Sequence, residues 1–288
     1  MEILRAIDDM RGWSERERLA RRRIAFVPTM GYLHRGHLQL VSEARRRAER
    51  VVVSIFVNPI QFGPGEDFDR YPRDLERDER LAREAGTDVL FVPELREMYP
   101  PGFETHVEVE RATRRLCGAS RPGHFRGVTT VLTKLFHIVQ PHVAVFGEKD
   151  FQQLAVVRRM VRDLDFGIEI VGVPTVREED GLATSSRNVY LRPEERRAAL
   201  ALPRALAAAR EAVARGEKDG RSVLAAARRV LESEPQVEID YVELADPETI
   251  EEVEEIAKPT LLALAARVGS TRLIDNCVLS PPGADTAS

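Results

Sequence analysis

Residues 26–41 read FVPTMGYLHRGHLQLV, and the order of residue types in this stretch predicts a strand, a loop with two glycines and a helix. The apolar run at residues 24–27 is typical of a buried strand, and we expect Pro28 to end its ladder of hydrogen bonds. Gly31 and Gly36 allow a tight backbone and the close approach of a ligand. Beyond the second glycine, apolar residues recur at helical spacing, so the rest of the chain is expected to be organised around this strand, loop and helix.

Two histidines, His34 and His37, stand three residues apart where the predicted helix begins. At that spacing their side chains lie near each other on one face of the helix. A helix start presents free N–H groups and the positive end of its dipole, which suits a phosphate group. A histidine at such a position is also often only a capping or packing residue, so the pair alone leaves both interpretations open.

Further apolar runs alternate with helical segments along the first part of the chain. Residues 51–57 (VVVSIFV) and 143–147 (VAVFG) are continuous apolar runs of the kind found in parallel strands buried on both faces. We also expect strands at residues 89–93, 106–109 and 168–173, and helices at residues 74–85 and 128–139. Strands and helices that alternate at this spacing indicate right-handed βαβ units and a Rossmann-like parallel sheet with helices on both faces. Ligands bind such sheets beyond the carboxyl ends of the strands.

The N-terminal segment, residues 2–23, predicts a short strand followed by a charged helix. We expect Trp13 and Leu19 to be the inward side chains of that helix. The first residues contain neither the apolar run nor the small-residue cleavage site of an export signal, so no export is implied.

A lysine and an aspartate follow the predicted strand at residues 143–147. Lys149 can meet a phosphate as a compact charge, and Asp150 can either cap the next helix or reach a hydrated magnesium ion. A surface lysine beside a helix cap is the commoner explanation of such a dipeptide. The position of the pair at the carboxyl end of a buried strand favours a functional role here.

The loop at residues 184–188 (TSSRN) offers hydroxyl donors and a guanidinium group. Together, Ser185, Ser186 and Arg187 can hold a polyphosphate. Serine and arginine are common in loops, so this cluster is a weak signal when taken alone. A mobile loop of this composition suits a lid over a triphosphate.

The composition changes beyond residue 192 to alanine-rich helical segments, expected at residues 195–215 and 221–232. Three strands follow without intervening helices, at residues 239–244, 260–265 and 273–279, which indicates a small antiparallel sheet. We therefore expect a Rossmann-like domain over residues 1–177 and a smaller C-terminal α+β domain over residues 178–288. The tail after Pro281 is expected to be loose.

Composition limits the class of protein. The chain has 288 residues, 43% hydrophobic and 31% charged, with a formal net charge of −4. This length suits one large domain or two modest ones, and we expect two; no run approaches the roughly 20 apolar residues that a membrane span needs. The arginine clusters at residues 21–23 and 45–47 are flanked by acids, which is typical of solvated helix faces and not of a nucleic-acid surface. Two cysteines, Cys117 and Cys277, give neither a disulfide framework nor metal-ligand spacing, so we expect a cytoplasmic protein without a protein-held metal cluster.

The motifs, taken in order, resemble those of the pantothenate synthetase (pantoate–β-alanine ligase) family, a member of the HxGH nucleotidylyl transferase superfamily, over essentially the whole chain. The residues that carry the resemblance are 28–31 with 34–37, 54–63, 71–73, 146–153, 172–177, 185–191 and 269–276. Each motif alone is a modest signal, but their order and spacing are specific. The chain departs from the family at Thr184, where the family usually has methionine or leucine, which removes an apolar contact expected near the adenine.

The resemblance implies a reaction in two steps. The pantoate carboxylate attacks the α-phosphate of magnesium ATP and pyrophosphate leaves; the amine of β-alanine then attacks the pantoyl adenylate and releases AMP. Charge grows on the phosphates in the first step, so fixed donors there stabilise its transition state. No nucleophilic side chain is needed, because positioning and the exclusion of water carry the second step. The family is typically homodimeric.

The resemblance also assigns site residues. His37, His34, Lys149 and Arg187 would be catalytic, with His37 mainly a donor to phosphate. ATP would contact Met30, Gly31, Tyr32, Leu33, His34, Arg35, Gly36, His37, Gly147, Glu148, Lys149, Asp150, Val176, Thr184, Ser185, Ser186 and Arg187. Pantoate needs amide hydrogen bonds beside an apolar wall; Gln61 and Gln153 match the family's glutamines, and Met30 and Phe56 would form the wall.

Two other functions remain open at this point. A nucleotidylyl transferase of coenzyme A or NAD biosynthesis would share the histidine loop, but it has no need of two glutamines around a small hydroxy acid. A non-catalytic ATP-binding module would keep the fold and lose the ligation.

Overall fold

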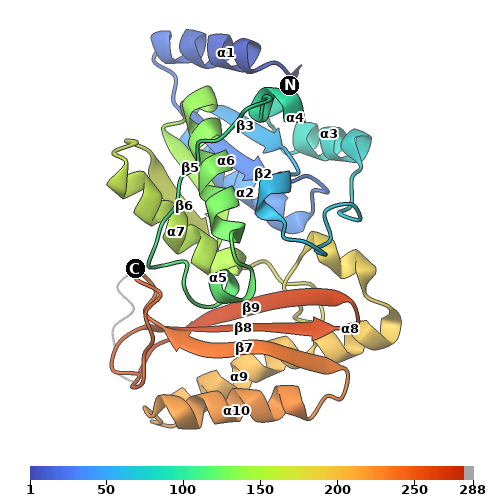
Figure 1. Cartoon of the computed structure of the whole chain (residues 1–288), viewed down its shortest axis with the longest axis vertical. Coiled ribbons are helices and arrows are strands. Elements are labelled where there is room, and N and C mark those ends of the chain that lie inside the picture. Colours follow the sequence, from blue (N-terminus) through green and yellow to red (C-terminus); the bar gives the residue numbers. More distant parts are fainter. Residues whose placement is uncertain (282–288) are drawn as a thin grey trace. The chain divides into compact units, whose positions relative to one another are not determined.

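The computed structural model describes residues 1–281, which form two compact units (Figure 1). The first unit comprises residues 1–109, 121–148 and 156–176; the second comprises residues 110–120, 149–155 and 177 onward. The expectation from sequence was a single division after residue 177. In the structure, residues 110–120 and 149–155 group with the C-terminal part, because residues of these two segments form hydrogen bonds with that part or with each other. The expected loose tail after Pro281 lies outside the described residues.

A six-stranded parallel sheet forms the centre of the first unit, in the order β1-β4-β3-β2-β5-β6. Its strands are β1 (Glu2–Leu4), β2 (Ile24–Thr29), β3 (Arg50–Ile55), β4 (Val89–Phe91), β5 (Val143–Gly147) and β6 (Glu169–Val173). The apolar runs of the sequence become these buried strands. The strand order reverses direction at β2, which lies between β3 and β5, so its carboxyl end is the switch point at which sheets of this kind bind ligands.

Helices cover both faces of this sheet, as expected. They are α1 (Ile7–Leu19), α2 (Arg35–Arg47), α3 (Leu75–Glu84), α4 (Leu95–Met98), α6 (His124–Val139) and most of α7 (Phe151–Asp163). On one face, Val41 of α2 and Ala82 of α3 share a core cluster with Val27 of β2. On the other face, Phe26 packs edge to face against Phe136 of α6, with ring centroids 6.3 Å apart.

Pro28 does not end its strand, contrary to expectation. It pairs with Ser54 in the β2–β3 register, and the strand continues to Thr29, whose carbonyl accepts a hydrogen bond of 3.1 Å from Phe56 N. Backbone groups of alternate residues point to opposite sides of a strand, so Pro28 faces β5. The pairing of β2 with β5 covers only Ala25 and Phe26, and the proline therefore leaves no ladder bond unmade.

Two further expectations in this unit are wrong. Leu19 is 77% exposed, because it lies six residues after Trp13 and a helix turns it well away from the face that buries Trp13. Residues 106–109 form no strand, since their backbone bonds to a helix instead of a sheet. Val107 N donates to Thr130 Oγ1 at 3.0 Å, and Val107 O accepts from Thr129 Oγ1 at 2.6 Å.

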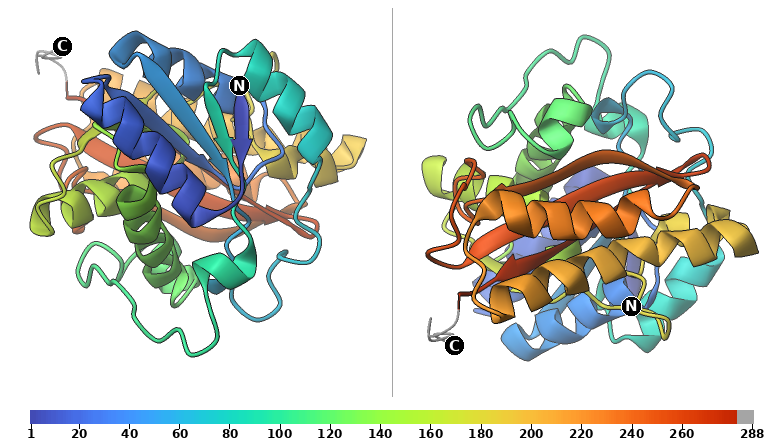
Figure 2. Two further views of the ribbon diagram at one scale, coloured as in Figure 1. Left: turned by 90° about the horizontal axis from the view of Figure 1, so that it is seen from above. Right: turned by 90° about the horizontal axis from the view of Figure 1, so that it is seen from below.

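The second unit is built on a three-stranded antiparallel sheet, as expected. The strands are β7 (Val237–Ala245), β8 (Thr260–Val268) and β9 (Thr271–Leu279), in that order. The helices are α5 (Cys117–Ser120), α8 (Pro193–Ala199), α9 (Ala201–Ala214) and α10 (Gly220–Glu232), with a short 3₁₀ turn η3 (Ser186–Tyr190). Helices α9 and α10 lie side by side across one face of this sheet, and small alanine side chains allow their close approach (Figure 2).

The expected helix at residues 195–215 is divided at Leu200 into α8 and α9. Pro203 lies one turn beyond the division. It has no N–H to donate to the carbonyl of Ala199, and its ring excludes that bond, so the helix cannot continue regularly through this point. None of the helices in the described residues is both long enough and apolar enough to span a membrane.

Asp246, after β7, provides a test of pH dependence in the second unit. A hydrogen bond of 2.6 Å from Lys258 Nζ lowers the pKa of Asp246 from an ordinary 3.8 to about 2, against the opposing effect of burial. Because the folded-state pKa is depressed, the stabilisation is present above about pH 4 and is lost as pH falls through about 2. We expect Asp246→Asn to lower the midpoint of urea unfolding slightly at pH 7, with the difference from wild type shrinking below pH 4. An equal difference at pH 7 and pH 3 would contradict this assignment.

Candidate active site

The loop after β2 is held in one conformation by its own backbone and by neighbouring side chains. Gly31 and Tyr32 have positive φ angles of 82° and 51°. A side chain at Gly31 would place its Cβ 2.9 Å from Ile55 Cγ2 and 3.0 Å from Asp78 Oδ2, so only glycine fits. Thr29 Oγ1 accepts a 3.0 Å hydrogen bond from Gly31 N.

Asp78, on α3, fixes the same loop, and sequence analysis missed it. Its carboxylate accepts hydrogen bonds of 2.6 Å from Tyr32 N and 2.6 Å from Leu33 N, and the residue is 1% exposed. Burial raises the pKa of Asp78 above its ordinary value, although the two N–H donors and nearby Arg77 act in the opposite direction. The available signal was an acid in the helical stripe that otherwise holds Leu75 and Ala82.

The two histidines come together at the start of α2. His34 is the N-cap residue, and its ring stacks on that of His37 with centroids 3.9 Å apart and planes 27° apart. A Cβ at Gly36 would lie 2.9 Å from His34 Cε1, so the glycine permits the stack. His34 N donates to His37 Nδ1 at 3.4 Å. In neutral His37 the proton is therefore on Nε2, which makes that atom a donor. Arg35 between them is exposed.

Gln61 lies in the 3₁₀ turn η1 (Pro59–Gln61) after β3, and the structure brings it to Met30. Gln61 Nε2 is 3.3 Å from Met30 Sδ, and the glutamine is 8% exposed. The backbone carbonyl of Gln61 accepts hydrogen bonds from His124 Nδ1 at 2.8 Å and from Arg121 Nη2 at 3.4 Å. Phe56 is buried near the same turn. Three of the four residues expected around pantoate therefore belong to the first unit.

Arg121 is itself fixed by Glu66, through hydrogen bonds of 2.7 Å from Nε and 2.6 Å from Nη2. Burial alone would raise the pKa of Glu66, but the bonds and charge of Arg121 outweigh it and hold that pKa below its ordinary value. This ion pair steadies the turn that carries Gln61, and sequence analysis gave it no role.

Lys149 and Asp150 follow β5 in a 3₁₀ turn, η2 (Glu148–Asp150), that leads into α7. Gly147 ends the strand and Glu148 begins the turn. In the second unit, the carbonyl of Lys149 accepts a 2.9 Å hydrogen bond from Asn276 Nδ2, and Lys149 Nζ is 3.8 Å from Asp150 Oδ1. The Asp150 side chain is 50% exposed. Gln153 is half-buried on the first turn of α7.

The loop that follows Val176 is anchored at both ends within the second unit. Arg177 forms a bidentate ion pair with buried Asp275, at 2.7 and 2.9 Å. At the other end, Asn188 Nδ2 donates to Glu178 Oε1 at 2.6 Å. Ser185 Oγ accepts from Arg187 N at 3.3 Å, so Ser185 caps the η3 turn that contains Ser186 and Arg187. Thr184 and Ser186 are buried, 8% and 7% exposed.

Adjacent residues of β9 hold both elements of the second unit that were predicted to bind phosphate. Asp275 bonds Arg177 at the base of the loop, and Asn276 bonds the Lys149 turn. Sequence analysis placed both residues in the motif at 269–276 but gave neither of them a role, because the motif does not show which distant loop the strand will support.

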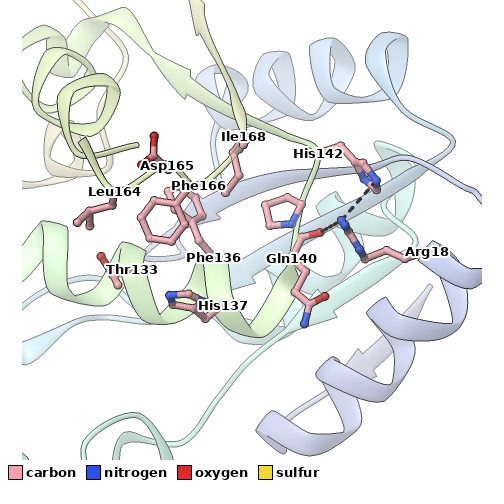
Figure 3. A pocket seen from close by; sticks show the side chains of 12 residues that line it. Arg18, Thr133, Phe136, His137, Gln140, His142, Leu164, Asp165, Phe166 and Ile168 are labelled. Atoms are coloured by element: carbon pink, nitrogen blue, oxygen red, sulfur yellow. Dashed lines mark hydrogen bonds between the residues drawn. The ribbon is translucent and has the colours of Figure 1, made fainter. Parts of the chain in front are cut away.

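A cavity elsewhere in the first unit contains none of the predicted site residues (Figure 3). It measures about 520 Å³ and lies beside the segments that precede β5 and β6, at the amino ends of these strands. Arg18 Nη1 donates to Gln140 O at 2.9 Å and lies 3.4 Å from His142 Nε2. The described residues also include no group of three or more histidine, cysteine or acidic side chains arranged to hold a metal ion.

Comparisons with known proteins agree over nearly the whole chain. A family model described as pantoate-beta-alanine ligase matches residues 2–278. A pantothenate synthetase from Heliobacterium modesticaldum is 59% identical over 279 residues, covering 97% of this chain and 99% of the relative. One from Syntrophobacter fumaroxidans is 58% identical over 281 residues, covering 98% and 99%.

Solved structures give the same result. The pantothenate synthetase of Thermus thermophilus superimposes with a TM-score of 0.93 at 53% identity, covering 98% of this chain and 100% of that one. A pantoate-beta-alanine ligase from Francisella tularensis, complexed with beta-gamma ATP and beta-alanine, has a TM-score of 0.79 at 30% identity, covering 96% and 97%.

Proposed function

The chain belongs to the pantoate-beta-alanine ligase family and is an ATP-dependent ligase that joins pantoate to β-alanine, and we propose which of its residues carry each step. The observation that carries the assignment is the match to the family from residue 2 to residue 278, together with the rigid histidine loop at the switch point of the sheet. Neither a nucleotidylyl transferase nor a non-catalytic module is favoured by relatives of this similarity.

The proposed chemistry has two transfers. A pantoate carboxylate oxygen bonds to the α-phosphorus of ATP, and the bond to pyrophosphate breaks. The β-alanine nitrogen then bonds to the acyl carbon, the acyl–oxygen bond to AMP breaks, and the amine loses a proton. The protein has to hold the reactants in line and exclude water, because an acyl adenylate hydrolyses readily.

We assign the α-phosphate and leaving pyrophosphate to the histidine loop. The N–H groups at the start of α2 and the Nε2 donor of His37 give this loop the donors that negative charge requires. His34 supports His37 through the stacked rings and the backbone bond to Nδ1. The ATP contacts proposed in the first unit are Met30, Gly31, Tyr32, Leu33, His34, Arg35, Gly36, His37, Gly147, Glu148 and Val176.

The second unit would supply the cationic groups. We propose that Lys149 and Arg187 bind the phosphates, with Ser185 and Ser186 as hydroxyl donors and Thr184 beside the adenine. The C-terminal domain, residues 178–288, would act as a lid. The anchoring of its loop by Arg177 and Asn188 supports a loop that moves with its domain.

Asp150 is the residue that would hold magnesium. Mg²⁺ keeps most of its waters and takes one or two carboxylates together with substrate phosphates, so a single exposed carboxylate beside Lys149 fits it. When bound, the ion would neutralise charge on the phosphate oxygens.

Pantoate would be held by Gln61 and Gln153, with Met30 and Phe56 as the apolar wall. We expect Gln61→Ala or Gln153→Ala to raise KM for pantoate about 10- to 100-fold, because each removes a hydrogen bond to a charged or polar oxygen. Steady-state kinetics with ATP saturating measure this. The exposed glutamines Gln39 and Gln236 supply matched alanine controls, and an unchanged pantoate dependence in both site variants would refute the pocket.

One experiment tests the proposed reaction as a whole. Protein, magnesium ATP and pantoate are mixed without β-alanine, and pyrophosphate is measured. We expect one equivalent of pyrophosphate per site, with AMP released only after β-alanine is added. Continuous AMP release without β-alanine, or no pyrophosphate, would contradict the assignment.

Assembly and compartment are further proposals. We infer a homodimer from the family, which sedimentation of the purified protein measures. A reducing cytoplasm is supported by two cysteines that are both free and buried. Excess acid over base argues against a nucleic-acid partner.

A further inference from the structure

Four groups of the first unit form a chain of hydrogen bonds that ends at Gln61. Tyr99 Oη donates to Asn58 Oδ1 at 2.8 Å. Asn58 Nδ2 lies 3.1 Å from the carbonyl of Gly127 and 3.0 Å from Gln61 Oε1. Asn58 is 1% exposed, so each of its polar atoms needs a partner within the protein.

The Gly127 carbonyl oxygen determines which group donates and which accepts in each hydrogen bond of this series. The carbonyl of Gly127 can only accept, so the Asn58 atom that faces it must be the nitrogen. The Asn58 oxygen then faces Tyr99, whose hydroxyl must donate. The Gln61 atom that faces the Asn58 nitrogen must be an acceptor, which is Oε1. Gln61 is therefore left to present its Nε2, a donor, on the side of Met30.

The backbone is shaped to allow this arrangement. A Cβ at Gly127 would lie 2.4 Å from Ile60 O and 2.6 Å from Gln61 Cα, so only glycine lets α6 come close enough for its carbonyl to accept from Asn58. Tyr99 is held by packing against Phe56, with centroids 6.0 Å apart, and against Phe103, at 4.9 Å. Burial raises the pKa of Tyr99, so its hydroxyl keeps its proton.

We propose that Tyr99 is a positioning residue for pantoate: together with the Gly127 carbonyl, its hydroxyl holds the Asn58 amide in the orientation that makes Gln61 present an N–H donor, which selects a substrate oxygen that accepts. This rests on the proposed function of Gln61. The Tyr99 hydroxyl is the hydrogen-bond donor to Asn58 Oδ1, which has no access to water. Removing the hydroxyl leaves Asn58 Oδ1 unsatisfied and takes away one of the bonds that hold the amide orienting Gln61.

Tyr99→Phe tests this directly, because it removes the donor and keeps the ring. We expect KM for pantoate to rise about tenfold with KM for ATP unchanged. In a Gln61→Ala background the same substitution should have no further effect on pantoate. Phe103→Leu is the matched control: it weakens the packing of Tyr99 but keeps the hydroxyl, and it should leave KM for pantoate within twofold of wild type.

Asn58→Asp provides a second variant. Its carboxylate still accepts from Tyr99 but has no donor for Gln61, whose amide then turns its carbonyl outward, and KM for pantoate should rise at least as much. The inference is overturned if Tyr99→Phe leaves the pantoate KM unchanged, or if its effect persists in full without Gln61. A wild-type protein that releases no pyrophosphate with pantoate would instead overturn the proposed function.

Discussion

Lys149→Ala is expected to reduce the rate of pyrophosphate release from ATP and pantoate by about 10²–10³-fold, while the reaction of supplied pantoyl adenylate with β-alanine keeps nearly its full rate. In our assignment the ammonium stabilises charge that grows on the phosphates in the first step only. Removing an interaction that exists only in the transition state of one step should not slow the other step.

The substitution should remove the Lys149 ammonium without disturbing the turn that carries it. The turn is held by the Lys149 carbonyl, which accepts from Asn276 Nδ2 at 2.9 Å, and alanine keeps that bond. Lys149→Gln keeps most of the length of the side chain and removes its charge, so it should resemble alanine if charge matters. Exposed Lys218 in the second unit gives a control substitution. Quenched-flow measurement of each half-reaction separates the two steps, and an equal loss in both would show that Lys149 does not act on phosphate.

The fold was predictable from sequence wherever one chain segment fixes its own surroundings. The runs at residues 51–57 and 143–147, which contain most of β3 and β5, are apolar at nearly every position, and only a strand covered on both faces requires this. The strand, glycine loop and helix around Gly31 were predictable for the same reason. The expected strand at residues 106–109 did not form, because the backbone of Val107 bonds to the hydroxyls of Thr129 and Thr130 and not to another strand.

The candidate site was predictable only in part. His34, Gln61 and Lys149 stand in sequence motifs, and they were predicted as site residues from those motifs. Some of the residues that hold them lie far away in sequence: Asn276 supports the Lys149 turn from 127 positions further along. Only the folded structure brings such a supporting residue to its loop, so local sequence patterns cannot show which residue supports which loop.

Asp78 is the supporting residue whose removal should be felt most. It is 45 or more positions from the loop that it holds, and it is the acceptor for two consecutive N–H groups, of Tyr32 and Leu33. Alanine would remove the carboxylate that accepts from these two N–H groups. A buried N–H group that loses its acceptor costs about 1–3 kcal/mol of stability. We expect Asp78→Ala to lower the free energy of unfolding by roughly 2–4 kcal/mol.

The same substitution should act on ATP more than on pantoate, because the loop with Tyr32 and Leu33 leads directly into the histidines. We expect KM for ATP to rise at least tenfold, as a loss of about 1.4 kcal/mol in binding requires. Asp78→Asn should be intermediate, since its oxygen still accepts one bond while its NH₂ group faces the other donor. Glu76→Ala, an exposed acid on the same helix, is the control. Urea unfolding and steady-state kinetics measure the two effects. If Asp78→Ala unfolds as wild type does, or if both substrates are affected alike, the loop does not depend on this carboxylate.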